Sequence, residues 1–278
     1  MSCHLLVDAK PITIPVAKTK SIPMPILIIP LIVGLIFATP ELFAQQDVLY
    51  QVSTLDALVS GVFEGGTTLA ELSTHGDFGI GTFNSVDGEM LFLDGFFYRI
   101  DGAGKVRLAD MGEKTPFAAV TFFEADQSMT ADSCLDQEAF FRFIEGRLPS
   151  PNLFYAVKVH GIFRSVRTRS VPRQEKPYRP LTEVVKTQPV FEFKNVTGVM
   201  AGFRCPDYVQ GINFKGYHLH FLAKEGAGGG HVLGFVTDRV TVEIDRTDEL
   251  RLKLPADSAF FKAGLSSDRT ADVSKVEK

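Results

Sequence analysis

The 278-residue chain contains no tryptophan, only three cysteines and no marked excess of charge, its formal net charge being −4. A chain of this length buries enough apolar surface to fold without disulfide bonds, and its length predicts one or two domains. No basic run with interleaved aromatic residues is present, which argues against nucleic acid as a partner. The hydrophobic (45%) and charged (22%) fractions are ordinary and indicate a globular protein.

A long uninterrupted apolar segment is also missing. The longest apolar piece near the N-terminus, residues 31–38, is far too short to cross the ~30 Å hydrocarbon core of a bilayer. Lys18 and Lys20 precede an apolar run over residues 22–38, which three prolines interrupt. This order of segments is typical of an export signal. We therefore predict that residues 1–44 are a cleaved signal and that the protein is periplasmic or secreted, with no stable membrane anchor; a retained anchor is the alternative.

The few cysteines leave room for one disulfide bond. Cys3 lies in the predicted signal, so the mature chain keeps only Cys134 and Cys205. These two could pair in an oxidising compartment, or both could be buried free thiols. They are not at metal-ligand spacing, which makes them poor zinc ligands.

Short apolar segments alternate with turn signals after residue 48, without the regular strand–helix alternation of a parallel α/β fold. Cap and periodicity patterns predict helices over 54–62 with Ser53 as N-cap, over 67–73, and from a Ser133 cap to Glu145. Alternating apolar residues predict strands over 78–84, 89–93, 96–100, 118–123, 154–169, 216–223 and 231–246, and two strands within 190–204 around Lys194 and Asn195. The tail after Leu254 carries few structural signals. We predict an α+β fold with mixed or antiparallel sheets and few short helices, which could divide into two sub-domains near residues 170–188.

Three histidines fall within one predicted β-hairpin. His218 and His220 are two residues apart in a strand, so their side chains leave the same face. His231 follows a glycine-rich turn. With the turn centred near residues 225–226, His231 lies opposite His220, with Cβ atoms about 5 Å apart. Three converging imidazoles with an open fourth position suit a catalytic zinc ion; the alternative is that they are ordinary sheet histidines.

A cupin metal site also begins with His-x-His, and a glutamate follows it shortly. Glu225 comes five residues after His220. However, Ile212 stands where the cupin pattern expects a glycine, and the glycine after the glutamate is misplaced, so this pattern is met only in part. His75 and His160 are isolated in the sequence, and we assign them no role.

Two further features could place charge beside the histidines. Glu89 starts a strand after the Asp87-Gly88 turn and faces the same way as Leu91. A carboxylate on an apolar face needs a cation, a metal or a hydrogen-bond donor, unless the strand end is solvated. Arg167 and Arg169 are predicted to share one strand face, where a guanidinium could bind a substrate carboxylate with two hydrogen bonds. The alternative for the arginines is also a solvated strand end.

These residues belong to three segments that together resemble the signatures of the α-acetolactate decarboxylase family. The matching pieces are 77–83 (DFGIGTF) with 87–89 (DGE), 94–95 (DG) and 98–99 (YR); 167–172 (RTRSVP) with 174–178 (QEKPY); and 211–213 (GIN), 216–221 (GYHLHF) and 228–233 (GGGHVL). Such long matches in a fixed order, spread over roughly residues 49–242, are far more specific than any three-residue pattern.

The resemblance implies that residues 45–278 form a catalytic domain that converts 2-acetolactate into acetoin and carbon dioxide with the help of Zn²⁺. The implied residues are Glu89, Arg169 and Glu277 for catalysis and His218, His220 and His231 for the metal. Glu277 is included because the family uses a glutamate near its C-terminus, and this is the only glutamate after Glu249. A homodimer is also implied. The alternatives are a non-catalytic periplasmic zinc-binding protein, or another metal-dependent lyase on the same scaffold.

Overall fold

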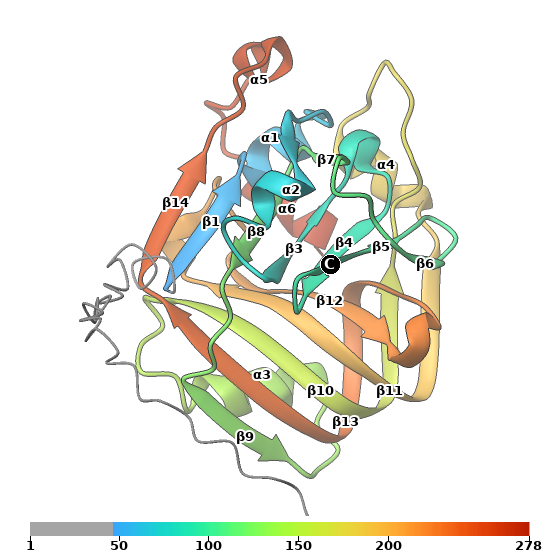
Figure 1. Ribbon diagram of the computed structural model, residues 1–278, viewed down its shortest axis with the longest axis vertical. Helices are drawn as coiled ribbons and strands as arrows, with labels where there is room; N and C mark the ends of the chain where they lie inside the picture. Colours follow the sequence, from blue (N-terminus) through green and yellow to red (C-terminus); the bar gives the residue numbers. More distant parts are fainter. Residues whose placement is uncertain (1–46, 278) are drawn as a thin grey trace, which may run out of the picture. The chain divides into compact units, whose positions relative to one another are not determined.

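The computed structural model describes residues 47–277, so the predicted export signal and its cleavage point lie outside the described residues. Strands dominate and form two large sheets, accompanied by short helices (Figure 1). The predicted α+β class is therefore confirmed. All described residues belong to one compact unit. The predicted sub-domain boundary near residues 170–188 stays a prediction.

The first sheet has seven strands. Their order across the sheet is β14 (Glu249–Lys253), β1 (Val48–Val52), β8 (Ala118–Thr121), β3 (Phe78–Thr82), β4 (Glu89–Leu93), β5 (Phe96–Ile100) and β6 (Val106–Leu108). β1 and β14 are parallel, whereas the other neighbours are antiparallel. The sheet is therefore mixed, as the sequence predicts.

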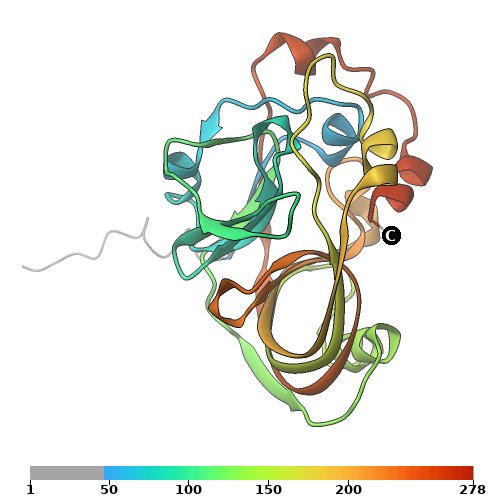
Figure 2. The same ribbon diagram turned by 90° about the vertical axis from the view of Figure 1, so that its right-hand side faces the viewer.

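The second sheet closes on itself. It contains β10 (Phe154–Arg169), β11 (Val190–Cys205), β12 (Gly216–Ala223) and β13 (Gly229–Thr247), with β9 (Gln127–Ala131) paired to the outer edge of β13. Each of the four long strands pairs with the next, and β13 pairs with β10 as well, so the strands form a ring. Figure 2 shows this ring end-on, below the first sheet.

The alternation of side chains along β12 determines which of them face the interior of the ring and which face the first sheet. Leu219 and Phe221 belong to the apolar cluster of the ring. Residues that alternate with them must leave the opposite face. The cross-strand partners there, Ala201 and Phe203, pack against the first sheet. His218 and His220 therefore face the first sheet rather than the interior of the ring.

The helices are short, and three of them gather at one end of the molecule. The described helices are α1 (Leu55–Val59), α2 (Leu69–Leu72), α3 (Gln137–Glu145), α4 (Leu181–Val184), α5 (Ser258–Lys262) and α6 (Thr270–Glu277), with 3₁₀ turns η2 (Asn84–Val86), η3 (Val185–Thr187), η4 (Asp207–Val209) and η5 (Lys224–Gly226). A two-stranded sheet pairs β2 (Thr67–Thr68) with β7 (Lys114–Thr115). α1, α4 and α6 share an apolar cluster near the end of the chain (Figure 2).

All three predicted helices start later than predicted. The helix predicted over 67–73 is α2, which starts at Leu69 because Thr67 and Thr68 form β2. In the other two helices a neighbouring side chain supplies the cap. Ser53 has a left-handed backbone (φ 65°), and the Thr54 hydroxyl accepts the hydrogen bond from Ala57 N. α1 then ends at Val59, short of the predicted residue 62. Likewise α3 starts only after Asp136, whose carboxylate accepts from Ala139 N. Serine, threonine and aspartate all cap helices well, so composition alone did not separate them.

The strand predictions were more accurate. The bounds of β4, β5, β10 and β12 agree with the predicted ranges. The two strands predicted within 190–204 are instead one strand, β11. Asn195 takes a positive φ of 48° without breaking the pairing with β10, which continues at Lys194 and Val196.

Several elements were not predicted from the sequence: the strands β1, β2, β6, β7, β9 and β14 and the helices α4, α5 and α6. No helix of the part described here is long and apolar enough to cross a membrane. Cys134 is exposed and Cys205 is buried, and both are free thiols. The disulfide alternative is therefore not realised, and only one of the two thiols is buried. Burial raises the pKa of Cys205 to about 12, which keeps its thiol protonated and unreactive.

Candidate active site

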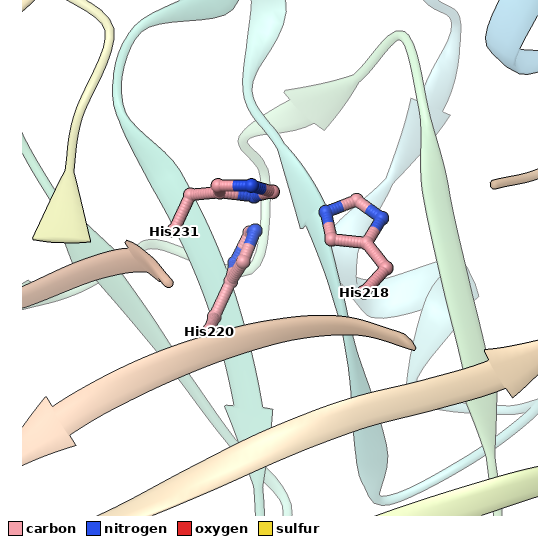
Figure 3. A group of neighbouring side chains, drawn as sticks. All are labelled: His218, His220 and His231. Carbon is pink, nitrogen blue, oxygen red and sulfur yellow. The ribbon is translucent and has the colours of Figure 1, made fainter. Parts of the chain in front are cut away.

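The three histidines of the β12–β13 hairpin converge on one point. His220 lies directly opposite His231, as the sequence predicts, and His218 lies two residues before His220 on the same face. One ring nitrogen of each side chain lies within 4.8 Å of those of the other two. All three are buried, and their rings point toward one another (Figure 3). Within residues 47–277 they are the group of side chains that could hold a metal ion.

A row of cross-strand neighbours brings Arg169 to the same place. Arg169 on β10 pairs with His231 on β13, which pairs with His220 on β12. Directly opposed residues share a face of a sheet. The close approach of β13 and β10 depends on Gly230, where an added Cβ would lie 2.3 Å from the Arg169 carbonyl oxygen. Arg169 is 4% exposed, and its Nη1 donates to Gln188 Oε1 at 3.0 Å.

Arg167 does not join Arg169, which corrects the predicted shared face. The pairing of β10 with β13 shifts register between Arg167 and Thr168. Such a bulge interrupts the two-residue alternation of a strand. Arg167 is consequently exposed, whereas Thr168 and Arg169 are both buried. The Thr168 hydroxyl donates to the Gly229 carbonyl at 2.7 Å and ties the bulge to the histidine hairpin.

Glu89 reaches the histidines from the first sheet. It is the first residue of β4 and is only 8% exposed, so the alternative of a solvated strand end is wrong. Its Oε2 lies 3.5 Å from His220 Nε2, and its Oε1 accepts from Val171 N at 3.3 Å. The carboxylate is thus fixed between His220 and the segment that follows Arg169.

An ion-pair network holds the turn that precedes Glu89. Asp87 pairs with Arg99, which also contacts Glu113. The Arg99 guanidinium lies 3.9 Å from the centre of the Phe83 ring and is largely buried. Removing one partner of a buried ion pair leaves the other charge buried and unpaired, which destabilises the fold by about 3–5 kcal/mol. The network therefore fixes the start of β4.

Contacts around His220 prepare it to bind a metal. Its Nδ1 lies 2.8 Å from the Met90 carbonyl oxygen. Because a carbonyl can only accept, Nδ1 carries the proton and Nε2 keeps its lone pair. This Nε2 is buried and has no hydrogen-bond partner among residues 47–277. A backbone carbonyl on the far nitrogen is the usual support of a metal-bound histidine.

The surroundings of His218 and His220 favour the neutral form of their imidazoles. Burial, and secondarily the charge of Arg169, lowers the pKa of His218 to about 3. Burial, followed by His218, also lowers the pKa of His220 well below its ordinary value. Histidine binds metals in its neutral form, so His218 and His220 could bind a cation at neutral pH.

A cavity opens beside the histidines, with about 430 Å³ of empty space between its lining atoms when the solvent at its mouth is included. Its polar side is formed by Glu89, Arg169 and the three histidines. Its apolar side is formed by Leu55, Leu58, Val86, Phe117, Val171, Leu181, Val185 and Val276. A cavity that is mostly apolar with a few convergent polar groups is what a small-molecule site requires.

The C-terminal helix reaches this cavity. Val276 of α6 is buried and lines it, and Glu277 is the next residue and the last of the helix. The segment around the predicted C-terminal glutamate therefore lies at the site. Sequence reasoning did not place the wall residues Val86 and Val276 there, because their local patterns are those of ordinary core valines.

The other sequence candidates lie elsewhere. Glu225 is exposed and does not line the cavity, so the cupin arrangement of ligands is not formed. His75 stacks on Tyr50, with ring centroids 3.8 Å apart. His160 lies 3.5 Å from Glu243 on the surface of the ring. Neither histidine joins the cluster.

Comparison with known proteins agrees with this geometry. The family model described as alpha-acetolactate decarboxylase matches residues 49–267. The alpha-acetolactate decarboxylase of Methanosarcina mazei is 48% identical over 233 residues, which is 84% of this chain and 81% of the relative. That of Bacillus subtilis is 44% identical over 82% of this chain and 90% of its own length.

Solved structures give the same result for the fold. The crystal structure of alpha-acetolactate decarboxylase from Bacillus subtilis superimposes with a TM-score of 0.81 at 43% identity, covering 83% of this chain and 99% of that one. A protein from Staphylococcus aureus described as similar to alpha-acetolactate decarboxylase gives 0.78 at 35% identity, covering 82% and 98%. The chain therefore belongs to the alpha-acetolactate decarboxylase family and is a carboxy-lyase.

Proposed function

We propose that this protein converts 2-acetolactate into acetoin and carbon dioxide, with a zinc ion held by His218, His220 and His231. One observation carries the proposal: three buried histidine nitrogens lie within 4.8 Å of one another in a cavity that also exposes a carboxylate and a guanidinium. The names of the relatives support the same substrate.

The donor set fits a catalytic zinc ion. Three histidine ligands leave a fourth position of a tetrahedral ion open for substrate or water. His220 Nδ1 is hydrogen-bonded to the Met90 carbonyl oxygen. The buried Nε2 of the same ring is therefore the nitrogen that could bind the metal. Imidazole also suits copper, iron and nickel, so the choice of zinc rests on the family resemblance.

Decarboxylation of a β-keto acid sends an electron pair toward the ketone oxygen. When bound, the metal would supply a Lewis acid for the negative charge that develops there. Arg169 would hold the substrate carboxylate or hydroxyl, because a buried guanidinium orients such groups with directed hydrogen bonds. The apolar wall of the cavity would exclude water, which strengthens both electrostatic contacts.

The carbon that loses carbon dioxide must then gain a proton. Glu89 is the proposed donor, since its carboxylate is fixed beside the histidines by Val171 N. Glu277 is a second proposed acid, from α6. A carboxylic acid held in place accelerates such a transfer by about 10²–10⁴-fold.

We also propose that the protein is exported and acts as a homodimer. Export is supported by the pattern of residues 1–44. The dimer is supported by the family resemblance alone.

The His220→Ala variant tests the proposal. It should lose bound zinc and acetoin formation together, because only two ligands remain. His160→Ala is the matched control, since His160 is a half-exposed histidine outside the cluster, and it should keep both. Zinc is measured by elemental analysis, and acetoin and carbon dioxide by product assay. A His220→Ala protein with full activity would overturn the proposed site, whereas wild-type zinc binding without acetoin would favour a non-catalytic zinc protein.

A further inference from the structure

The turn that brings Glu89 to the cavity contains a residue in an uncommon conformation. Val86 has a φ of 49°, in the left-handed region. A β-branched side chain is rarely found there, because it crowds its own backbone. Glycine and asparagine adopt this conformation far more readily, yet the chain has valine at this position.

Two separate segments, one at Phe63 and the other over residues 171–174, hold the turn in place. Ser85 N donates to Phe63 O at 2.7 Å, and Ser85 O accepts from Gln174 N at 2.8 Å. Gly88 N lies 3.0 Å from Val171 O and also 3.0 Å from Val86 O. An unfavourable backbone conformation persists only where the surroundings fix it in this way, and such residues cluster at functional sites.

The side chain of Val86 lies where substrate would bind. It is 4% exposed and lines the cavity together with Glu89, Arg169 and the three histidines. On the apolar side it packs in one cluster with Val171 and Val276. The turn therefore presents two groups to one cavity, an acid at Glu89 and a methyl-bearing wall at Val86.

We propose that Val86 is a specificity-determining residue that disfavours an alkyl group larger than methyl on the carbinol carbon of the substrate. This inference rests on the proposed function, because it concerns the substrate of that reaction. 2-Acetolactate carries a methyl group at this carbon, and 2-aceto-2-hydroxybutyrate carries an ethyl group. One methylene in an apolar pocket changes kcat/KM by about 10–200-fold.

The test is the ratio of kcat/KM for the ethyl substrate to kcat/KM for the methyl substrate, measured on the full chain. Val86→Ala should raise this ratio about tenfold or more, and Val86→Leu should lower it. Val59→Ala is the matched control: Val59 is 1% exposed in the same apolar cluster but does not line the cavity. It should lose stability without changing the ratio.

A purely structural role of Val86 would lower both rate constants together and leave the ratio unchanged in all variants, which would overturn the inference. If Val86→Ala does not fold, Val86→Gly takes its place, because glycine adopts a positive φ without steric cost; an unchanged ratio in that variant also overturns it. A wild-type protein that makes no acetoin defeats the proposed function, whereas an active wild type with an unchanged ratio in the variants defeats only the role of Val86.

Discussion

Glu89 illustrates how a single residue acquires a role through its neighbours. A glutamate at the start of a strand is ordinary, and the sequence left open whether it is solvated. In the folded protein its carboxylate lies 3.5 Å from His220 Nε2 and is almost shielded from water. A buried carboxyl group, when it is protonated, can pass its proton to a bound molecule without competition from solvent.

We expect Glu89→Gln to keep zinc and to lower kcat by about 10²–10⁴-fold, the usual contribution of a general acid. The amide preserves the size of the side chain but cannot give up a proton in the same way. Stopped acetoin assays, with zinc content measured in the same sample, check this. Glu225→Gln, at an exposed position, is the control. A near wild-type rate in Glu89→Gln would remove Glu89 from the proton transfer.

The histidines were predictable residue by residue, and the arginines were not. Two-residue spacing and a hairpin offset place His218, His220 and His231 together, because strand geometry is regular. The same rule fails for Arg167 and Arg169, because the bulge between Arg167 and Thr168 changes the alternation. Bulges depend on the partner strand, which a local pattern does not contain.

At the scale of elements, the last helix forms part of the cavity although its sequence signal is weak. α6 is polar on most of its surface, and only Val276 and Val273 join the apolar cluster around α1 and α4. Gln210, after β11, donates to Asp268 and Thr270 and ties the start of α6 to the rest of the protein. Contacts between residues so far apart in the sequence cannot be predicted from a short segment. For this reason no helix was predicted in the C-terminal tail.

A chain that ends at residue 269 should lose more activity than Glu277→Gln. Both changes remove the acid of Glu277, but the truncation also removes Val276 and opens the apolar wall to water. We expect at least a further tenfold loss in kcat/KM, about 1.4 kcal/mol of transition-state stabilisation. Steady-state kinetics give the comparison, and circular dichroism shows whether the truncated chain is folded. Equal losses in the two variants would mean that α6 contributes nothing beyond its glutamate.

At the scale of the whole molecule, a buried aspartate links the second sheet to the segment that follows β8 of the first sheet. Asp245 on β13 is 1% exposed and accepts from Glu124 N, just after β8 of the first sheet, at 3.3 Å. Burial, together with the charges of Asp126, Asp47 and Glu124, raises the pKa of Asp245 to about 8. Its carboxyl group is therefore protonated in the folded protein at a pH where it is ionised in the unfolded chain.

This predicts a stability that falls as the pH rises from about 4 to about 8, because the unfolded state releases the proton first. Asp245→Asn, which mimics the protonated form, should be more stable than wild type at pH 8–9 by at least about 1 kcal/mol, roughly what one unit of pKa shift represents. The advantage should shrink toward pH 5. Thermal unfolding followed by circular dichroism measures it, with Asp248→Asn as the exposed control. A difference that is constant with pH would contradict the assignment.

The class of the fold could be predicted from the sequence, but the closure of the second sheet into a ring could not. Strand lengths and turn residues predicted an α+β protein with mixed or antiparallel sheets. Nothing local indicated that β13 pairs with both β10 and β12, since pairings over such sequence distances depend on the complete set of strands. The site depends on that closure, because the ring aligns Arg169, His231 and His220 in one row.

The central claim is that acetoin formation depends on the metal held by the three histidines. It is tested most directly by assaying purified protein on freshly made racemic 2-acetolactate before chelation, after chelation and after zinc is added back. We predict that activity disappears with the metal and returns with it. Full activity in protein from which the metal has been stripped would contradict the proposed mechanism.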